Sequence, residues 1–155
     1  MLTLILKAAH VLAAFVFLGG GVVSAWWKVR ADRSGDARVI AWCQREIVLA
    51  DWVFTVPSAV ALPATGALLV ERYSIPWDTP WIWWGFGAWA VAGVCWLPAA
   101  FLQITMRRLA RRALDEGTPL PPEFRRANRI WMALGAPSFV AALFAVWVMI
   151  AKWSF

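Results

Sequence analysis

Four apolar blocks, each long enough to cross a lipid bilayer, restrict what this chain can fold into. They cover about residues 2–27, 46–70, 81–106 and 130–153, with short charged or proline-rich stretches between them. A helix that spans the hydrocarbon core needs about 20 apolar residues. Hydrophobic residues make up 62% of the 155 residues, whereas soluble domains contain roughly 45–50%. We therefore predict a single integral membrane domain over residues 1–155, all-α, folded as an up-down bundle of four transmembrane helices.

The distribution of lysine and arginine predicts the orientation of these helices. The stretch between the second and third blocks contains only Arg72, whereas the other two connecting stretches are strongly basic. Their basic residues are Lys28, Arg30, Arg33, Arg38 and Arg45 in a predicted loop over 28–45, and Arg107, Arg108, Arg111, Arg112, Arg125, Arg126 and Arg129 before the fourth block. Cytoplasmic loops carry such an excess. We expect both termini on the periplasmic side of a bacterial inner (cytoplasmic) membrane.

The same charges narrow the choice of partners. The net charge is +6, but the basic residues flank apolar blocks and leave no soluble domain to carry a nucleic-acid patch. The lipid bilayer is the predicted partner.

The first block resembles a secretory signal at Val23-Ser24-Ala25, yet its positive cluster follows the apolar core, which favours a retained helix. Cys43 and Cys95 lie at different predicted depths and have no CxxC partner, so we expect two small buried residues and no disulfide.

Small residues predict which helix faces pack closely. Gly19-Gly20-Gly21 with Ser24 marks one face of the first block, and Gly85, Gly87 and Gly93 mark the third. In lipid, small residues let helices approach each other, because no hydrophobic force distinguishes a neighbouring helix from lipid tails. These faces also suit a homodimer.

His10 is the only histidine of the chain and lies in the first block, about 10 Å below the predicted outer surface. A neutral imidazole is a common ligand of haem iron. His10 is therefore the candidate metal and haem b ligand, and a hydrogen bond between helices is the alternative reading of this residue. Thr65, Trp89 and Phe144 are expected at the same depth in the other blocks. None of these is a second iron ligand, so the haem would be five-coordinate or would share a ligand from a second copy.

Asp51 opens the second block and is an ionisable residue inside a span, which makes it a functional candidate by default. Antiparallel helices bring their ends to one level, so we expect a buried polar cluster of Asp51 with Thr55, Gln103 and Ser24, and with Asn128 near it. Arg129 or Arg45 would supply a counter-charge. The cluster is either a proton or ligand site or a polar contact that holds the helices together. His10 and Asp51 lie on opposite sides of the bilayer and cannot form one catalytic pair. No catalytic residue is assigned, and enzymatic activity is left open.

Several motifs resemble one bacterial family. They are Leu6-Lys7-Ala8-Ala9-His10, Asp51-Trp52-x-Phe54-Thr55-x-Pro57 with Pro63-x-Thr65-Gly66, Trp96-Leu97-Pro98 with Gln103 and Met106, and Leu120-Pro121-Pro122 with Trp131-x-x-Leu134-Gly135-x-Pro137. Together they are similar to the predicted integral membrane proteins grouped as domain of unknown function 2269. That resemblance implies four membrane helices and no established activity.

The start of the first block is more distantly similar to HemJ-type protoporphyrinogen oxidases and to the copper-resistance protein D family. In the HemJ-type group the first-helix histidine is implicated in haem or porphyrin binding, and His10 is the matching position. The lysine that this group carries in a later helix has no counterpart in the second or third block, which argues against porphyrinogen oxidase activity. Two functions remain open. One is haem b binding for electron transfer or porphyrin handling, and the other is a structural or partner subunit of a membrane complex without a cofactor.

Overall fold

Six helical segments make up residues 1–152, the part of the chain that the structure, a computed structural model, describes. In chain order they are α1 (Leu2–Ser34), α2 (Ala37–Ala50), the π-helical turn η1 (Asp51–Thr55), α3 (Val56–Arg72), α4 (Pro80–Glu116) and α5 (Pro122–Ala151). α2, η1 and α3 run on without a break, so the chain forms four long helical rods. Each rod is long and apolar enough to cross a membrane. The predicted all-α fold is confirmed.

Glycine, aspartate and proline residues end and begin these rods. α1 ends at Gly35 (φ 67°) and α4 at Gly117 (φ 65°), both in the left-handed region that glycine tolerates. Asp36 begins α2, because its side chain accepts a hydrogen bond of 2.7 Å from a backbone N–H of the first turn. Pro80 and Pro122 stand in the first turns of α4 and α5, where a missing N–H costs no helical hydrogen bond.

The helices extend beyond the predicted spans. The predicted loop over 28–45 is wrong, because α1 continues to Ser34 and α2 begins at Ala37. α4 likewise carries its arginines on to Glu116. The apolar blocks mark only the part of each helix that contacts lipid. Lysine, arginine, glutamine and alanine also favour a helix in water, so the helix continues past the apolar block. The predicted end of the fourth span, residue 153, lies outside the described residues.

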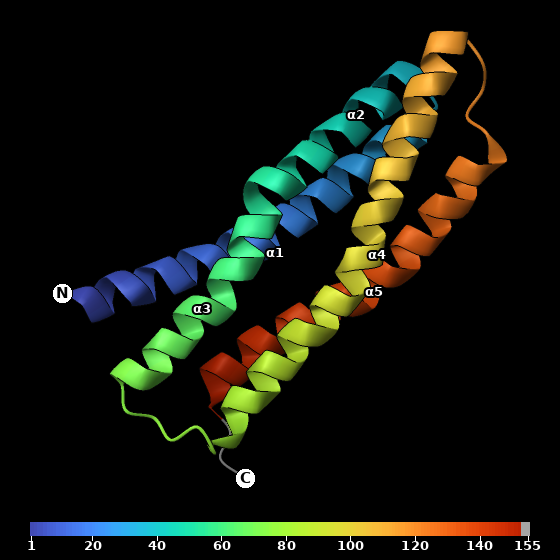
Figure 1. The fold of residues 1–155 in the computed structure, drawn as a ribbon. Helices are drawn as coiled ribbons and strands as arrows, with labels where there is room; N and C mark the ends of the chain where they lie inside the picture. The colour runs from blue at the N-terminus through green and yellow to red at the C-terminus, as the bar shows by residue number, and fades with distance from the viewer. Residues whose placement is uncertain (153–155) are drawn as a thin grey trace.

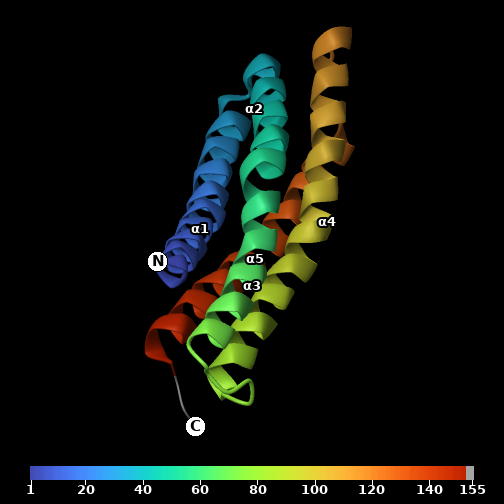
Figure 2. The same cartoon turned by 60° about the vertical axis from the view of Figure 1, so that its left-hand side comes forward.

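Successive rods run antiparallel, so both ends of the chain point to the same end of the bundle (Figure 1). We call the opposite end, formed by the α1–α2 and α4–α5 connections, the arginine-rich end. α4 and α5 pack most extensively on each other, α1 packs on α3 and α2, and α2 packs on α4. Both views show α1 beside α2 and α4 beside α5 (Figures 1 and 2). This is the predicted up-down arrangement of four helices.

The buried core lies toward the arginine-rich end. It joins α1, α2, α4 and α5 through a cluster of small and large apolar side chains, namely Ala31, Ile40, Ala41, Cys43, Ile47, Ala99, Met106, Ala110, Phe124, Ala127 and Trp131. Elsewhere the helices expose their apolar side chains. Only 6% of the most apolar stretch of α1 and 22% of that of α4 are buried inside the chain. Such surfaces suit contact with acyl chains or with other membrane helices.

The glycines divide into two groups. Gly19, Gly20 and Gly21 face open space, since no atom of the described residues lies within 4 Å of a β-carbon added to them. The prediction that another helix packs closely against this triplet is therefore not met by any helix of the described chain. Gly85 does serve a close contact, because a β-carbon there would collide with the side-chain methyl of Met149 on α5. This contact shows only that the flexible end of the Met149 side chain fills the space beside Gly85. Gly87 and Gly93 meet no atom of the described residues within 4 Å, so the close packing predicted for them is not met within the chain.

Candidate functional site

Polar side chains gather at three levels of the bundle, and the first level joins α1 to α3. His10 is half-buried, and its Nδ1 lies 2.9 Å from Oγ1 of Thr65. Gly66 lies against the ring, because a β-carbon there would be 3.4 Å from Cε1 of His10. Thr65 is one of the residues expected at the depth of His10. The side chain of Trp89 instead donates to the backbone carbonyl of Ala59, at 3.1 Å.

The contacts of Thr65 assign the tautomer of His10. Oγ1 of Thr65 lies 2.6 Å from the carbonyl oxygen of Ala61, and a carbonyl can only accept. The single hydroxyl hydrogen therefore points to Ala61, and Nδ1–H of His10 must donate to Thr65. Nε2 of the neutral ring then carries the free lone pair. No side chain of residues 1–152 forms a hydrogen bond with Nε2, and the backbone of Leu62 lies within hydrogen-bonding reach of the ring.

The second level surrounds Asp51 where α2 passes into α3. Thr55 is buried, and its hydroxyl donates to Oδ1 of Asp51 at 2.9 Å. The side chain of Gln103 on α4 is also buried and lies close enough to Asp51 to interact with its carboxyl group. Ser24 is half-buried and makes no hydrogen bond to this group in the described chain. Asn128 bonds Asp32 instead, and Arg45 pairs with Glu46 at the surface.

A π-helical turn positions Asp51. The backbone N–H of Val56 bonds the carbonyl of Asp51, five residues earlier, which widens the helix at η1. Pro57 follows directly and has no N–H to donate to Val53. Proline therefore accounts for the widened turn, and turns of this kind occur frequently at functional sites. Ser58 covers two carbonyls of the turn, donating to Phe54 at 2.6 Å and to Thr55 at 3.1 Å.

Several acceptor oxygens of this second level are enclosed without a donor in the described chain. They are Oδ2 of Asp51 and Oε1 of Gln103, and Oε1 of Gln44 is enclosed in the same way about two helical turns closer to the arginine-rich end. Gln44 is only 1% exposed and stands two turns before Asp51 on the same helical rod. The sequence reading missed Gln44, since it fell in the predicted loop. Its seven-residue spacing from Asp51, which places both on one helix face, is the signal that would have found it.

The third level, at the arginine-rich end, centres on a buried lysine. Lys28 is only 1% exposed, and its Nζ donates to Oδ2 of Asp32 at 2.8 Å. Nδ2 of Asn128 donates to the same oxygen at 3.0 Å. The rings of Trp131 and Phe124 lie over the ammonium group, with centroids 5.3 and 5.5 Å from Nζ. Aromatic faces attract a cation at such distances and compensate for the water it has lost.

This third level was also missed by the sequence reading, which counted Lys28 only as a loop charge. The signal was the four-residue spacing of Lys28 and Asp32, which pairs two side chains only if the stretch is helical. Trp131 lies in this cluster, whereas Trp52, which follows Asp51 in the chain, is exposed at the surface.

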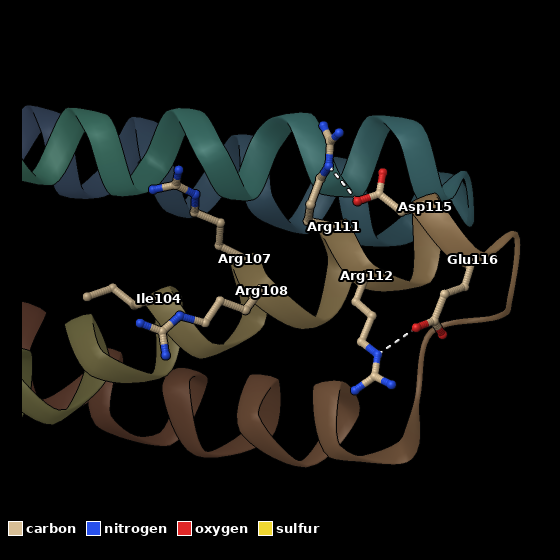
Figure 3. A pocket seen from close by; sticks show the side chains of 7 residues that line it. All are labelled: Ile104, Arg107, Arg108, Arg111, Arg112, Asp115 and Glu116. Carbon is tan, nitrogen blue, oxygen red and sulfur yellow. Dashed lines mark hydrogen bonds and ion pairs between the residues drawn. The ribbon is translucent and has the colours of Figure 1, made fainter.

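Four arginines of α4 surround a hollow of about 680 Å³ on the surface, but they do not converge on one point. Arg111 pairs with Asp115 at 2.9 Å and Arg112 with Glu116 at 2.7 Å. Arg107 and Arg108 extend to opposite sides of the helix (Figure 3). Exposed pairs of this kind contribute little to stability. The patch fits a role in setting the orientation of the span.

The described residues offer few side chains that could bind a metal ion together. Within residues 1–152 no group of three or more histidine, cysteine, aspartate or glutamate side chains is placed to hold a metal ion. Cys43 is buried and Cys95 half-buried, and both are unpaired.

Comparison with known proteins identifies the family. No curated protein and no solved structure matches the chain. The model of one family, described as predicted integral membrane protein (DUF2269), matches residues 4–153. That range contains all three polar levels and all four rods except the first two residues of α1. With its long apolar helices, the chain is therefore a multi-span integral membrane protein that belongs to the DUF2269 family.

Proposed function

We propose that this protein binds haem b in the bacterial inner membrane, with Nε2 of His10 as the axial ligand, and serves electron transfer or porphyrin handling. The observation that carries the proposal is the assigned tautomer. Nδ1 of His10 lies 2.9 Å from the Thr65 hydroxyl, which itself lies 2.6 Å from the carbonyl of Ala61. Nδ1–H is therefore the donor, and Nε2 carries the lone pair that would bind iron; the backbone of Leu62 also lies beside the ring. Ligating histidines almost always donate their other N–H in this way, and the bond fixes the ring and raises its basicity.

The surroundings of His10 support a ligand at Nε2. An acceptor that faces hydrocarbon without a donor costs free energy, because lipid offers no hydrogen bonds. A bound iron would remove that cost. Gly66 leaves the ring room, at a β-carbon distance of 3.4 Å. The porphyrin supplies four nitrogen ligands of its own, so a single histidine suffices for a five-coordinate haem.

The absorption spectrum of protein purified from its native membrane tests this proposal. We expect a Soret band that disappears in His10→Ala and persists in Thr65→Val. Thr65→Val keeps the ligand but removes the acceptor for Nδ1–H, so haem affinity should fall by about 10- to 100-fold. A wild-type protein that stays colourless after haem is added, or a His10→Ala variant that keeps the band, would overturn the proposal. Circular dichroism of each variant checks that the helices still form.

A subunit without a cofactor is the second candidate, and the open glycine triplet is the observation that favours it. Gly19, Gly20 and Gly21 meet no atom of the described residues within 4 Å, and α1 buries only 6% of its most apolar stretch. A second copy or a partner helix could cover this face. A dimer is also compatible with the haem proposal. A six-coordinate, low-spin haem with one haem per two chains would place His10 from each copy on one iron.

A further inference from the structure

The carboxyl group of Asp51 lies in an apolar stretch of the second rod. Trp52, Val53 and Phe54, which follow it, each expose more than half of their surface, so this turn of the rod faces lipid. Thr55 donates to Oδ1 of Asp51 at 2.9 Å, whereas Oδ2 has no donor in the described chain. An ionised carboxylate is costly in such surroundings, because lipid offers neither a donor nor a counter-charge.

No charged side chain of residues 1–152 forms an ion pair with Asp51. Of the two predicted counter-charges, Arg45 pairs with Glu46 and Arg129 is exposed. η1 packs on α1, α2 and α3, and Gln103 reaches it from α4. The ionisable side chains nearest to this level on those four helices are His10, Lys28 and Asp32 on α1, Cys43, Arg45 and Glu46 on α2, Glu71 on α3, and Cys95 and Arg107 on α4. Lys28 is already paired with Asp32, and Arg107 is exposed.

Gln103 provides a second acceptor that lacks a donor. This side chain is only 4% exposed, it reaches the carboxyl group of Asp51, and its Oε1 is enclosed without a donor in the described chain. The oxygen and nitrogen of an amide occupy nearly equivalent positions, and an enclosed oxygen without a donor indicates that the two should be exchanged. The amide then presents its oxygen to Asp51. Two oxygens can share a hydrogen bond only if one of them carries a proton.

The enclosure of these oxygens distinguishes a proton from other occupants. Neither Oδ2 of Asp51 nor Oε1 of Gln103 has surface that a water molecule can touch. A bound water or a metal ion would need room of its own beside them. A proton needs none, because it lies within the hydrogen bond. Asp32 is the contrasting case, since Lys28 already supplies a positive charge to its Oδ2 at 2.8 Å.

We propose that Asp51 is a proton-binding site within the membrane. The carboxyl group takes up one proton on Oδ2 and donates it to Oε1 of Gln103, while the hydroxyl of Thr55 donates to Oδ1. One proton per chain thus provides a partner for both oxygens and removes the negative charge from lipid. The site involves neither His10 nor its ligand, so it does not depend on the haem proposal.

Infrared difference spectra of the wild type and Asp51→Asn, both in lipid vesicles at about pH 6, test the proposal. An exposed aspartate, with a pKa of about 4, is ionised at this pH. We expect the wild type to show the C=O stretching band of a neutral carboxylic acid, which shifts in D2O and is missing in Asp51→Asn. Thr55→Val and Gln103→Leu should each raise the frequency of the band, because each removes one hydrogen bond of the acid. If Asp51→Asn does not fold, the shift in Thr55→Val still assigns the band to Asp51.

Glu46→Gln is the matched control, because Glu46 is a carboxylate on the same rod that is paired with Arg45. This variant should leave the acid band unchanged. The proposal is overturned if the bands that disappear in Asp51→Asn are those of an ionised carboxylate. An acid band that is lost in Glu46→Gln and kept in Asp51→Asn would also contradict it. Carboxylate bands that change when sodium is replaced by choline would show a metal cation in the site instead of a proton. Unchanged thermal melting checks that each variant remains folded.

Discussion

At the scale of single residues, the ammonium group of Lys28 has the largest free-energy cost of burial, because this lysine is only 1% exposed. Asp32 compensates for it, so Asp32→Asn should destabilise the protein by about 3 kcal/mol, because it leaves a charge enclosed without its partner. The double variant Lys28→Met with Asp32→Asn should recover most of that loss. Unfolding in a detergent–denaturant titration measures both variants.

The single variant Lys28→Met provides the control for this pair. It leaves Asp32, which is 20% exposed and still held by Asn128, so the loss should be smaller than in Asp32→Asn. If the two single variants lose equal stability and the double variant loses their sum, the ion pair does not hold the arginine-rich end together.

The sequence predicted a common depth correctly for His10 and Thr65 but not for Asp51 and Asn128, since Asn128 bonds Asp32 instead, and it did not predict residue burial. The position of His10 along its helix correctly placed Thr65 beside it, since antiparallel helices bring matching depths together. From the sequence, Lys28 was counted only as a loop charge and Gln44 was not singled out, and a lysine or a glutamine is rarely enclosed. What encloses them is the rings and helices of α4 and α5, distant in sequence. A single-sequence pattern carries no information on those neighbours.

At the scale of helices, proline and its compensating donors shape the second rod. Pro63 has no N–H for the carbonyl of Ala59, and the indole N–H of Trp89 on α4 bonds that carbonyl at 3.1 Å. Trp89→Phe should therefore cost about 0.6–1.7 kcal/mol, the range measured for hydrogen bonds between membrane helices. Adding Pro63→Ala should restore a donor from within the helix and recover part of the loss.

A double-mutant cycle over Trp89 and Pro63 checks this compensation by thermal unfolding in detergent. Trp52→Phe is the control for the loss of an indole, since Trp52 is 63% exposed. A cycle with no coupling energy would show that the indole does not serve the carbonyl freed by proline.

The spans themselves followed from hydropathy, because only a helix satisfies its own backbone across lipid. Their polar extensions, from Lys28 to Ser34 and from Ala37 to Arg45, did not follow. In those stretches charged and polar residues interrupt the apolar ones, and a search for apolar segments does not detect the helix. The widened turn at Asp51 also escaped prediction, although Pro57 marks its place. The sequence therefore predicted where lipid lies better than where helices end.

At the scale of the whole molecule, the two ends of the bundle differ. The core and the buried lysine lie toward the arginine-rich end. Toward the other end α1 packs on α3, with His10 between them. The proposed haem would therefore lie at the end of the bundle away from the buried core.

The orientation of the molecule decides which surface that is. The arginine distribution predicts that the α1–α2 and α4–α5 connections face the cytoplasm. Single cysteines at Ser34 and Asp78, introduced after Cys43→Ala and Cys95→Ala, should then differ in intact cells. Asp78→Cys, in the exposed connection between α3 and α4, should react with a membrane-impermeant maleimide. Ser34→Cys should react only after the cells are permeabilised. The reverse result would place His10 on the cytoplasmic side, and the proposed haem would then exchange electrons with cytoplasmic partners.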